Sequence, residues 1–235
     1  NSTNGFTTCQ WGLGTDTIVP ADYDGDQRTD IAVWRPTDGN FYIVNSSNST
    51  IKIDNFGLSG DIPTPQDWDG DAKADVSVFR AGSSGTFYYR GSLANPNGNT
   101  TFVPWGLNGD KPVIGDYDGD SLADAAVFRP SIGVWYIRKS SDGQLSATQF
   151  GISTDKIVPA DYDGDSRTDL GVYRDGIWYL WRSTEGFQAF QYGIAGDTPV
   201  SADYDGDGRA DTAIYRSGIW YVLRSTGGNI IGPFG

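Results

Sequence analysis

The residues of this chain with the clearest potential for chemistry are aspartates that recur at a fixed spacing. In the segment Asp22–Asp30 (DYDGDQRTD), aspartate occupies positions 1, 3, 5 and 9, and glycine occupies position 4. The same pattern returns at Asp67–Asp75, Asp116–Asp124, Asp161–Asp169 and Asp203–Asp211, at intervals of 42 to 49 residues. A repeat of this period indicates one supersecondary unit that is used five times.

The chemistry of such a loop is that of a calcium site. Ca²⁺ binds about 6–8 oxygen atoms at roughly 2.3–2.6 Å and tolerates flexible loops, and the glycine permits the sharp turn that brings alternate carboxylates together. Without a cation, four carboxylates so close together would repel one another or take up protons. We therefore expect about five Ca²⁺ per chain.

The expected ligands share positions in the repeat. The carboxylate ligands are Asp22, Asp24, Asp26, Asp30, Asp67, Asp69, Asp71, Asp75, Asp116, Asp118, Asp120, Asp124, Asp161, Asp163, Asp165, Asp169, Asp203, Asp205, Asp207 and Asp211. Position 7 has no shared side chain, so its backbone carbonyl is the expected ligand, and the residues there are Arg28, Lys73, Leu122, Arg167 and Arg209.

Two other interpretations of the loop are weaker. Aspartate and glycine both favour tight turns, but a turn needs one of each, whereas here four aspartates stay in register through five copies. An EF-hand would place a bidentate glutamate at position 12. That position is Val33, Val78, Val127, Val172 and Ile214.

Each repeat predicts four short strands. In the first copy, a segment from Ile18 to Asp22 precedes the loop, and Asp30–Arg35 follows it. A third strand then carries the aromatic pair Phe41-Tyr42, and a fourth ends in the pair Phe56-Gly57. The chain has 32 glycines, 14% aromatic residues and one glutamate, which is a composition typical of β-proteins.

We therefore predict an all-β fold in one domain spanning residues 1–235. Four strands in about 45 residues match the blade of a β-propeller, with the calcium loop between the first and second strands. Two segments compete for the fourth strand of the last blade, Phe6–Gly12 and Asn229–Gly235. A closed ring of five blades is the favoured solution, and a slice of a larger ring or a ring closed between copies of the chain are the alternatives.

The repeats resemble FG-GAP/VCBS-type repeats, the calcium-binding blades of integrin alpha-subunit propellers and of many bacterial secreted proteins. The resemblance covers about residues 6–235 and rests on the aspartate loop and on the aromatic-glycine pair. The "GAP" element is missing from these copies. The resemblance implies a propeller with calcium in the loop between a blade's first two strands, and a role in adhesion, glycan binding or scaffolding.

Charge and hydropathy exclude several classes of protein. The formal net charge is −13, but twenty of the 30 carboxylates lie in the five loops, so five bound Ca²⁺ would leave only about −3. There is no basic stripe for nucleic acid. No apolar run suits a membrane span, and no signal peptide is visible. Because such calcium sites suit the calcium concentration outside cells, we expect a secreted or cell-surface protein.

Little in the sequence supports catalysis. The chain has no histidine, which excludes imidazole acid–base chemistry and histidine triads. A glycosidase-like carboxylate pair or a tyrosine/arginine-based polysaccharide lyase is the enzymatic alternative, and we expect neither. The only acidic residues outside the repeated pattern are Asp38, Asp54, Asp142, Asp175 and Glu185.

Two further sets of residues could bind a ligand. An arginine ends the second strand of every repeat. It either pairs with the aspartate six residues before the loop (Asp16 in the first copy), tying neighbouring blades by a bidentate bridge, or binds an anionic ligand. These arginines are Arg35, Arg80, Arg129, Arg174 and Arg216. The aromatic residues outside the repeated pattern could stack on sugars or bind proteins, and they are Trp181, Tyr89 and Trp68.

Two functions from different classes remain open. The first is a calcium-stabilised extracellular binding or adhesion module, lectin-like in character, with a glycan or an extracellular protein as partner. The second is a structural scaffold, or a fragment of a larger propeller, that calcium makes rigid.

Overall fold

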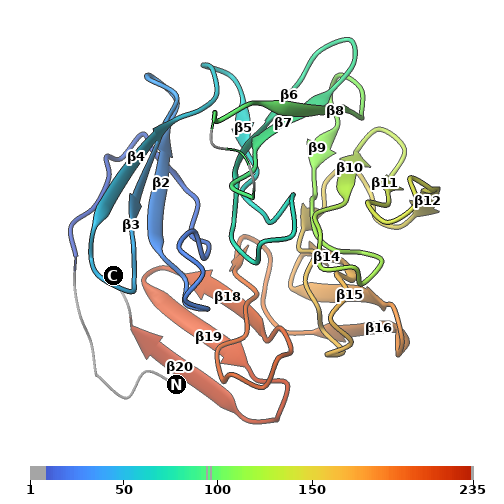
Figure 1. Cartoon of the computed structure of the whole chain (residues 1–235). Helices are drawn as coiled ribbons and strands as arrows, with labels where there is room; N and C mark the ends of the chain where they lie inside the picture. Colours follow the sequence, from blue (N-terminus) through green and yellow to red (C-terminus); the bar gives the residue numbers. More distant parts are fainter. Residues whose placement is uncertain (1–8, 94, 96, 234–235) are drawn as a thin grey trace.

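The computed structural model describes residues 9–93, 95 and 97–233, and within them every regular element is a β-strand. Twenty strands form five antiparallel sheets of four strands each, and every sheet uses four consecutive strands. Figure 1 shows the five sheets arranged as a ring, with β4, β12 and β20 toward its outside. The protein is a five-bladed β-propeller, as predicted. The described residues contain no helix that could cross a membrane.

The blades are numbered here in chain order. Blade 1 contains β1 (Thr17–Ile18), β2 (Ile31–Arg35), β3 (Asn40–Val44) and β4 (Ile51–Asn55). Blade 2 contains β5 (Ile62–Pro63), β6 (Val76–Arg80), β7 (Thr86–Arg90) and β8 (Thr101–Pro104). Blade 3 contains β9 (Lys111–Pro112), β10 (Ala125–Arg129), β11 (Val134–Arg138) and β12 (Leu145–Gln149). Blade 4 contains β13 (Lys156–Ile157), β14 (Leu170–Arg174), β15 (Ile177–Arg182) and β16 (Gly186–Gln191). Blade 5 contains β17 (Thr198–Pro199), β18 (Thr212–Arg216), β19 (Ile219–Leu223) and β20 (Asn229–Pro233).

The first strand of each blade is only two residues long, and the aspartate loop follows it. In blades 2, 3 and 5 the strand ends at a proline, which has no N–H for a further ladder bond. A single bridge between Ala21 and Asp30 then closes the neck of the first loop, and the other four loops have the same bridge. The loop therefore lies between the first and second strands, where the repeat placed it.

Apolar side chains join neighbouring blades. Trp34 and Phe41 of blade 1, both almost fully buried, pack in one cluster with Val78 of blade 2. Equivalent clusters join blades 2 and 3, blades 3 and 4, and blades 4 and 5. The repeated aromatic residues thus form the core between blades, as predicted.

The interface between blades 5 and 1 is built differently. Within the described residues, no core cluster joins these two blades. Ile31 at the start of β2 is 48% exposed, whereas its counterparts in the other four blades are at most 8% exposed: Val76, Ala125, Leu170 and Thr212. Among the described residues, four of the five interfaces are therefore closely packed, whereas the fifth leaves Ile31 of blade 1 exposed.

The C-terminal strand, not the N-terminal segment, completes the last blade. β20 pairs with β19, and the prediction that Asn229–Gly235 supplies a fourth strand is confirmed for residues 229–233. Residues 9–12 form no strand, so the prediction of a strand over Phe6–Gly12 is wrong there. Residues 6–8 and 234–235 lie outside the described residues. In place of strand pairing, Trp11 makes a side-chain contact: its Nε1 donates to the carbonyl of Tyr42 at 3.1 Å, as the Nε1 of Trp105 does to the carbonyl of Tyr136.

The arginine that ends each second strand pairs with the repeated aspartate. In blade 3, Nε and Nη2 of Arg129 donate to the two carboxylate oxygens of Asp110 at 2.8 and 2.9 Å. The guanidinium carbon also lies 4.4 Å from the ring centre of Tyr136. All five blades contain this arrangement. Both partners belong to one blade, so the expectation that the pair itself bridges neighbouring blades is wrong. The aspartate does accept from the N–H of Leu107, in the turn that arrives from the preceding blade.

Arg129→Ala is expected to destabilise the fold without changing its topology. The substitution leaves the Asp110 carboxylate, whose side chain is only 1% exposed, without its partner. Removing one partner of such a pair lowers the free energy of unfolding by roughly 2 kcal/mol. Thermal unfolding in calcium-containing buffer measures the loss. Arg138→Ala, which removes an exposed arginine from the neighbouring strand, is the control. Equal melting temperatures for the two variants would refute a structural role for the pair.

Candidate metal centre

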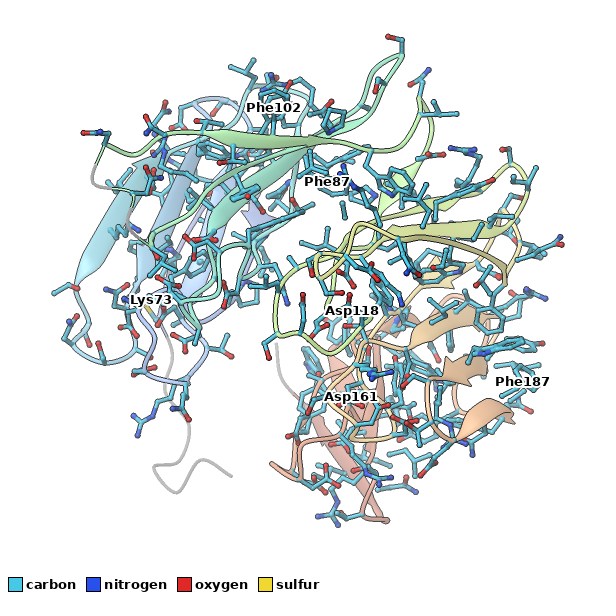
Figure 2. All side chains as sticks on the ribbon, turned by 45° about the vertical axis from the view of Figure 1, so that its right-hand side comes forward. Lys73, Phe87, Phe102, Asp118, Asp161 and Phe187 are labelled. Atoms are coloured by element: carbon cyan, nitrogen blue, oxygen red, sulfur yellow. The ribbon has the colours of Figure 1, made fainter. Side chains whose placement is uncertain are left out.

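The five aspartate loops lie on equivalent connections, close to the middle of the ring. In Figure 2, Asp118 and Asp161 lie toward the centre of the molecule, whereas Phe187 of β16 lies at its outer rim. Every loop brings three carboxylates together with oxygen atoms within 4.8 Å of one another. Positions 1 and 3 take part in all loops, joined by position 5 in the first two loops and by position 9 in the other three.

The aspartate at position 1 shapes the loop around itself. In the first loop, Oδ1 of Asp22 accepts from the N–H of Gly25 at 2.6 Å, and Oδ2 accepts from the N–H of Gln27 at 2.7 Å. The other four loops repeat both bonds, at distances up to 2.9 Å. The backbone thus wraps around a carboxylate, and this wrapping turns positions 3, 5 and 9 inward.

The backbone at position 6 is strained in four of the loops. Gln27, Ala72, Ser121 and Ser166 have φ between 62° and 69°, a left-handed conformation that non-glycine residues rarely adopt. The fifth loop has Gly208 there. The sequence pattern missed this requirement because only one of the five copies has glycine at position 6. Strain of this kind is concentrated at functional sites.

A serine outside the loop also belongs to the site. The N–H of Ser183, in the turn after β15, donates to Oδ1 of Asp169, and its hydroxyl donates to Asp165. The same two contacts recur in every blade, from Ser46, Ser92, Ser140 and Ser225. Sequence reasoning missed these serines. The signal was present, because each one follows the first residue of the third strand's aromatic pair by five positions.

The aspartate at position 3 leaves an oxygen without a partner. In the second, fourth and fifth loops, Oδ1 of Asp69, Asp163 and Asp205 is buried and accepts no hydrogen bond. The other oxygen is held in place: Oδ2 of Asp163 accepts from the N–H groups of Thr184 and Glu185 at 2.9 Å. A buried carboxylate oxygen without a donor is costly, and a cation would satisfy it. The donor set fits a hard cation such as Ca²⁺.

Burial and neighbouring charges raise the pKa of the position-9 aspartate in the second, third and fourth loops. Burial, together with the carboxylates of Asp69, Asp71 and Asp67, raises the pKa of Asp75 to about 7. Burial likewise raises the pKa of Asp169 to about 6 and raises that of Asp124. The ionised form of position 9 is thus unfavourable in these three loops, and a bound cation would favour it.

Position 7 has a structural role that the sequence did not indicate. The side chains of Lys73, Leu122, Arg167 and Arg209 lie over the position-4 glycine of the preceding loop, so that a Cβ on that glycine would come within 2.9 to 3.1 Å of them. The N–H of position 8 donates to the position-1 carbonyl of that same preceding loop at 2.5–2.7 Å. Successive loops are therefore joined to one another. Ligation by the position-7 carbonyl stays a prediction.

The three aromatic residues outside the repeated pattern lie beside cavities between blades. Trp68 is buried, and its ring stacks on that of Tyr89 with centres 5.0 Å apart. Together with Phe102 they line a cavity of about 450 Å³ between blades 2 and 3. Trp181 is half exposed and lines a cavity of about 200 Å³ between blades 3 and 4.

The fold is shared with propellers of different activities. The chain is similar to a streptogramin B lyase, with a TM-score of 0.58 and 10% identity over 93% of this chain and 72% of that one. It is also similar to virginiamycin B lyase from Staphylococcus aureus, with a TM-score of 0.58 and 8% identity over 95% and 73%. A lectin from Agrocybe aegerita that recognises non-reducing terminal N-acetylglucosamine has a TM-score of 0.56 and 18% identity over 93% and 65%. At these identities the likeness shows the fold alone.

Comparison by sequence is less informative. No protein-family model matches the chain, and no curated protein matches it either. The resemblance to FG-GAP/VCBS-type repeats therefore rests on the motifs themselves.

Asp163→Asn is expected to weaken calcium binding at the fourth loop by about tenfold or more, because it removes the charge of an inward-facing carboxylate. Calcium content after dialysis at low free calcium, together with a calcium titration, measures the change. The control is Asp142→Asn in an exposed turn outside the loops, which is expected to bind as much calcium as the parent chain. Unchanged calcium content in Asp163→Asn would contradict a metal site at this loop.

Proposed function

We propose that the protein is a calcium-stabilised extracellular binding module that recognises glycans. The observation that carries the calcium part is the set of buried, unpartnered oxygens on Asp69, Asp163 and Asp205, each inside a group of converging carboxylates. About five Ca²⁺ per chain would bind, one in each loop. The resemblance of the repeats to FG-GAP/VCBS-type blades supports the same assignment.

Cavities lined by aromatic residues support a glycan as the ligand. The rings around the cavity between blades 2 and 3, and Trp181 at the next cavity, offer apolar faces of the kind on which sugar rings stack. Both cavities also present hydroxyl groups and cationic side chains, including Ser140 and Lys139. A mixture of apolar wall and a few polar groups is typical of small-molecule sites.

The acidic residues outside the repeated pattern offer little for catalysis. Asp38 accepts from the hydroxyl of Tyr42, Asp54 pairs with Arg90, and Glu185 pairs with Arg182. None of them joins a group of three acidic residues in the described part of the chain. The lyases that share the fold do not change this assignment, since the likeness is one of fold.

A structural scaffold is the alternative function. The contacts between consecutive loops favour a scaffold function, because calcium at one loop would also fix the interface between two blades. The two functions differ in whether the calcium-loaded protein binds anything.

Calcium-dependent binding to a glycan array is the expected outcome for the intact chain. Trp181→Ala should reduce that binding several-fold, because the half-exposed ring lines a cavity, while the melting temperature changes little. Ile231→Ala, an exposed apolar residue on β20, is the control and should bind as the parent does. If the melting temperature depends on calcium but no binding to glycans or matrix proteins is detected, the scaffold function is favoured instead.

A further inference from the structure

A basic pocket lies between blades 4 and 5. Three arginines line it: Arg182 at the end of β15, Arg209 at position 7 of the fifth loop, and Arg224 just after β19. Gln188 and Phe190 of β16 add a polar and an apolar group from the outer strand. The cavity measures about 380 Å³, a size typical of small-molecule sites.

The positive charge of this pocket is not fully neutralised. Glu185 is the carboxylate that two of the arginines share: it pairs with Nη1 of Arg182 and lies 3.5 Å from Nη1 of Arg209. The Nε of Arg224 is buried and has no hydrogen-bond partner among the described residues. Glu185 thus pairs with two of the three guanidinium groups, and among the described residues no ion pair holds Arg224. Such a surplus at one point is unexpected in a chain with a net charge of −13.

The repeat explains part of this arrangement, because the position of Arg182 is also arginine in blade 5 (Arg224) and position 7 of the loop is basic in four of the five copies. The other blades differ at the position of Arg182. The position of Arg182 is Asn45 in blade 1, Gly91 in blade 2 and Lys139 in blade 3. The equivalent cavity between blades 3 and 4 has only Lys139 as a cationic group. Three arginines around one cavity are thus found between blades 4 and 5 and not in the cavity between blades 3 and 4.

We propose that the basic pocket binds an anionic sugar, a pyranose that carries a carboxylate or sulfate group. The guanidinium fork of arginine matches either group in a bidentate arrangement. The rings of Tyr162 and Phe190 supply an apolar wall for the sugar face, and the amide of Gln188 can reach ring hydroxyls. This assignment rests on the proposed function and names its ligand class.

Calcium controls the charge around the basic pocket. The turn that holds Glu185 is fixed by Asp163 of the fourth loop, and Ser225 at the pocket wall donates to Asp207 and Asp211 of the fifth. With calcium bound, these carboxylates are neutralised and the arginines dominate. Without calcium, the same carboxylates repel an anion, so anionic sugars bind to the calcium form.

Three tetrasaccharides distinguish the sources of negative charge. The first contains glucuronate, the second is the same sugar with its carboxylates reduced to hydroxymethyl groups, and the third is sulfated but lacks uronate. Each is titrated by calorimetry into the whole chain at 1 mM calcium and about 150 mM salt, where surface charges are largely screened. Tighter binding of an anionic sugar than of its neutral counterpart supports the proposal, and the first and third sugars tell carboxylate from sulfate.

Two substitutions with opposite expected signs test the residues. Arg224→Gln should lower the affinity for the anionic sugar by about tenfold or more, because charge-assisted hydrogen bonds are lost. Glu185→Gln should raise the affinity for the anionic sugar, because the carboxylate that competes for Arg182 and Arg209 is removed. Lys111→Gln removes one exposed positive charge from β9 and is the control for general electrostatic attraction. Affinities unchanged in Arg224→Gln and Glu185→Gln, or lowered equally in Lys111→Gln, would overturn the proposal.

Failure of this proposal can be told from failure of the proposed function. If the neutral and anionic tetrasaccharides bind equally well, the protein still binds glycans but the basic pocket is wrongly assigned. If the calcium form binds neither these sugars nor any glycan on the array, both proposals are overturned.

Discussion

The structure depends on carboxylates held close together in five short loops. Each loop wraps its backbone around the first aspartate and turns further carboxylates toward the same point. Such crowding is unfavourable without a cation, because the buried oxygens of Asp69, Asp163 and Asp205 have no donor. The loops also carry the contacts between blades, through Lys73 over Gly25 and the N–H of Ala74 on the carbonyl of Asp22. A cation in one loop would therefore stabilise two blades.

The interface between blades 5 and 1 lacks the contacts that join the other blades. In the described part of the chain, no side chain lies over Gly206, whereas a neighbouring loop's side chain covers the equivalent glycine in the other four loops. Ile31 is correspondingly exposed. Because apolar burial and loop-to-loop contacts both weaken at this interface, blades 5 and 1 depend more on the hydrogen bonds of their own sheets than the other three blades do.

The sequence predicts the repeated features well and the unrepeated ones poorly. Five aspartate loops, four strands per blade and the pairing of Arg129 with Asp110 follow from positions shared by every copy. The serine represented by Ser183 was overlooked because it lies in a variable turn, although its spacing is constant. The competition between Phe6–Gly12 and Asn229–Gly235 could not be decided from pattern, since both end in an aromatic-glycine pair. The short turn between β19 and β20 makes the local hairpin the less costly loop to close.

Calcium stoichiometry, combined with thermal unfolding in calcium and in EDTA, tests the central claim most directly. At about 100 times Kd, each site adds roughly 2.7 kcal/mol to the free energy of unfolding, so five sites together stabilise the fold strongly. The account predicts about five Ca²⁺ per chain and a large fall in melting temperature with EDTA that calcium, but not magnesium, reverses. A chain that binds no calcium and melts at the same temperature in EDTA would contradict it, and the aspartates would then be turn-forming residues only.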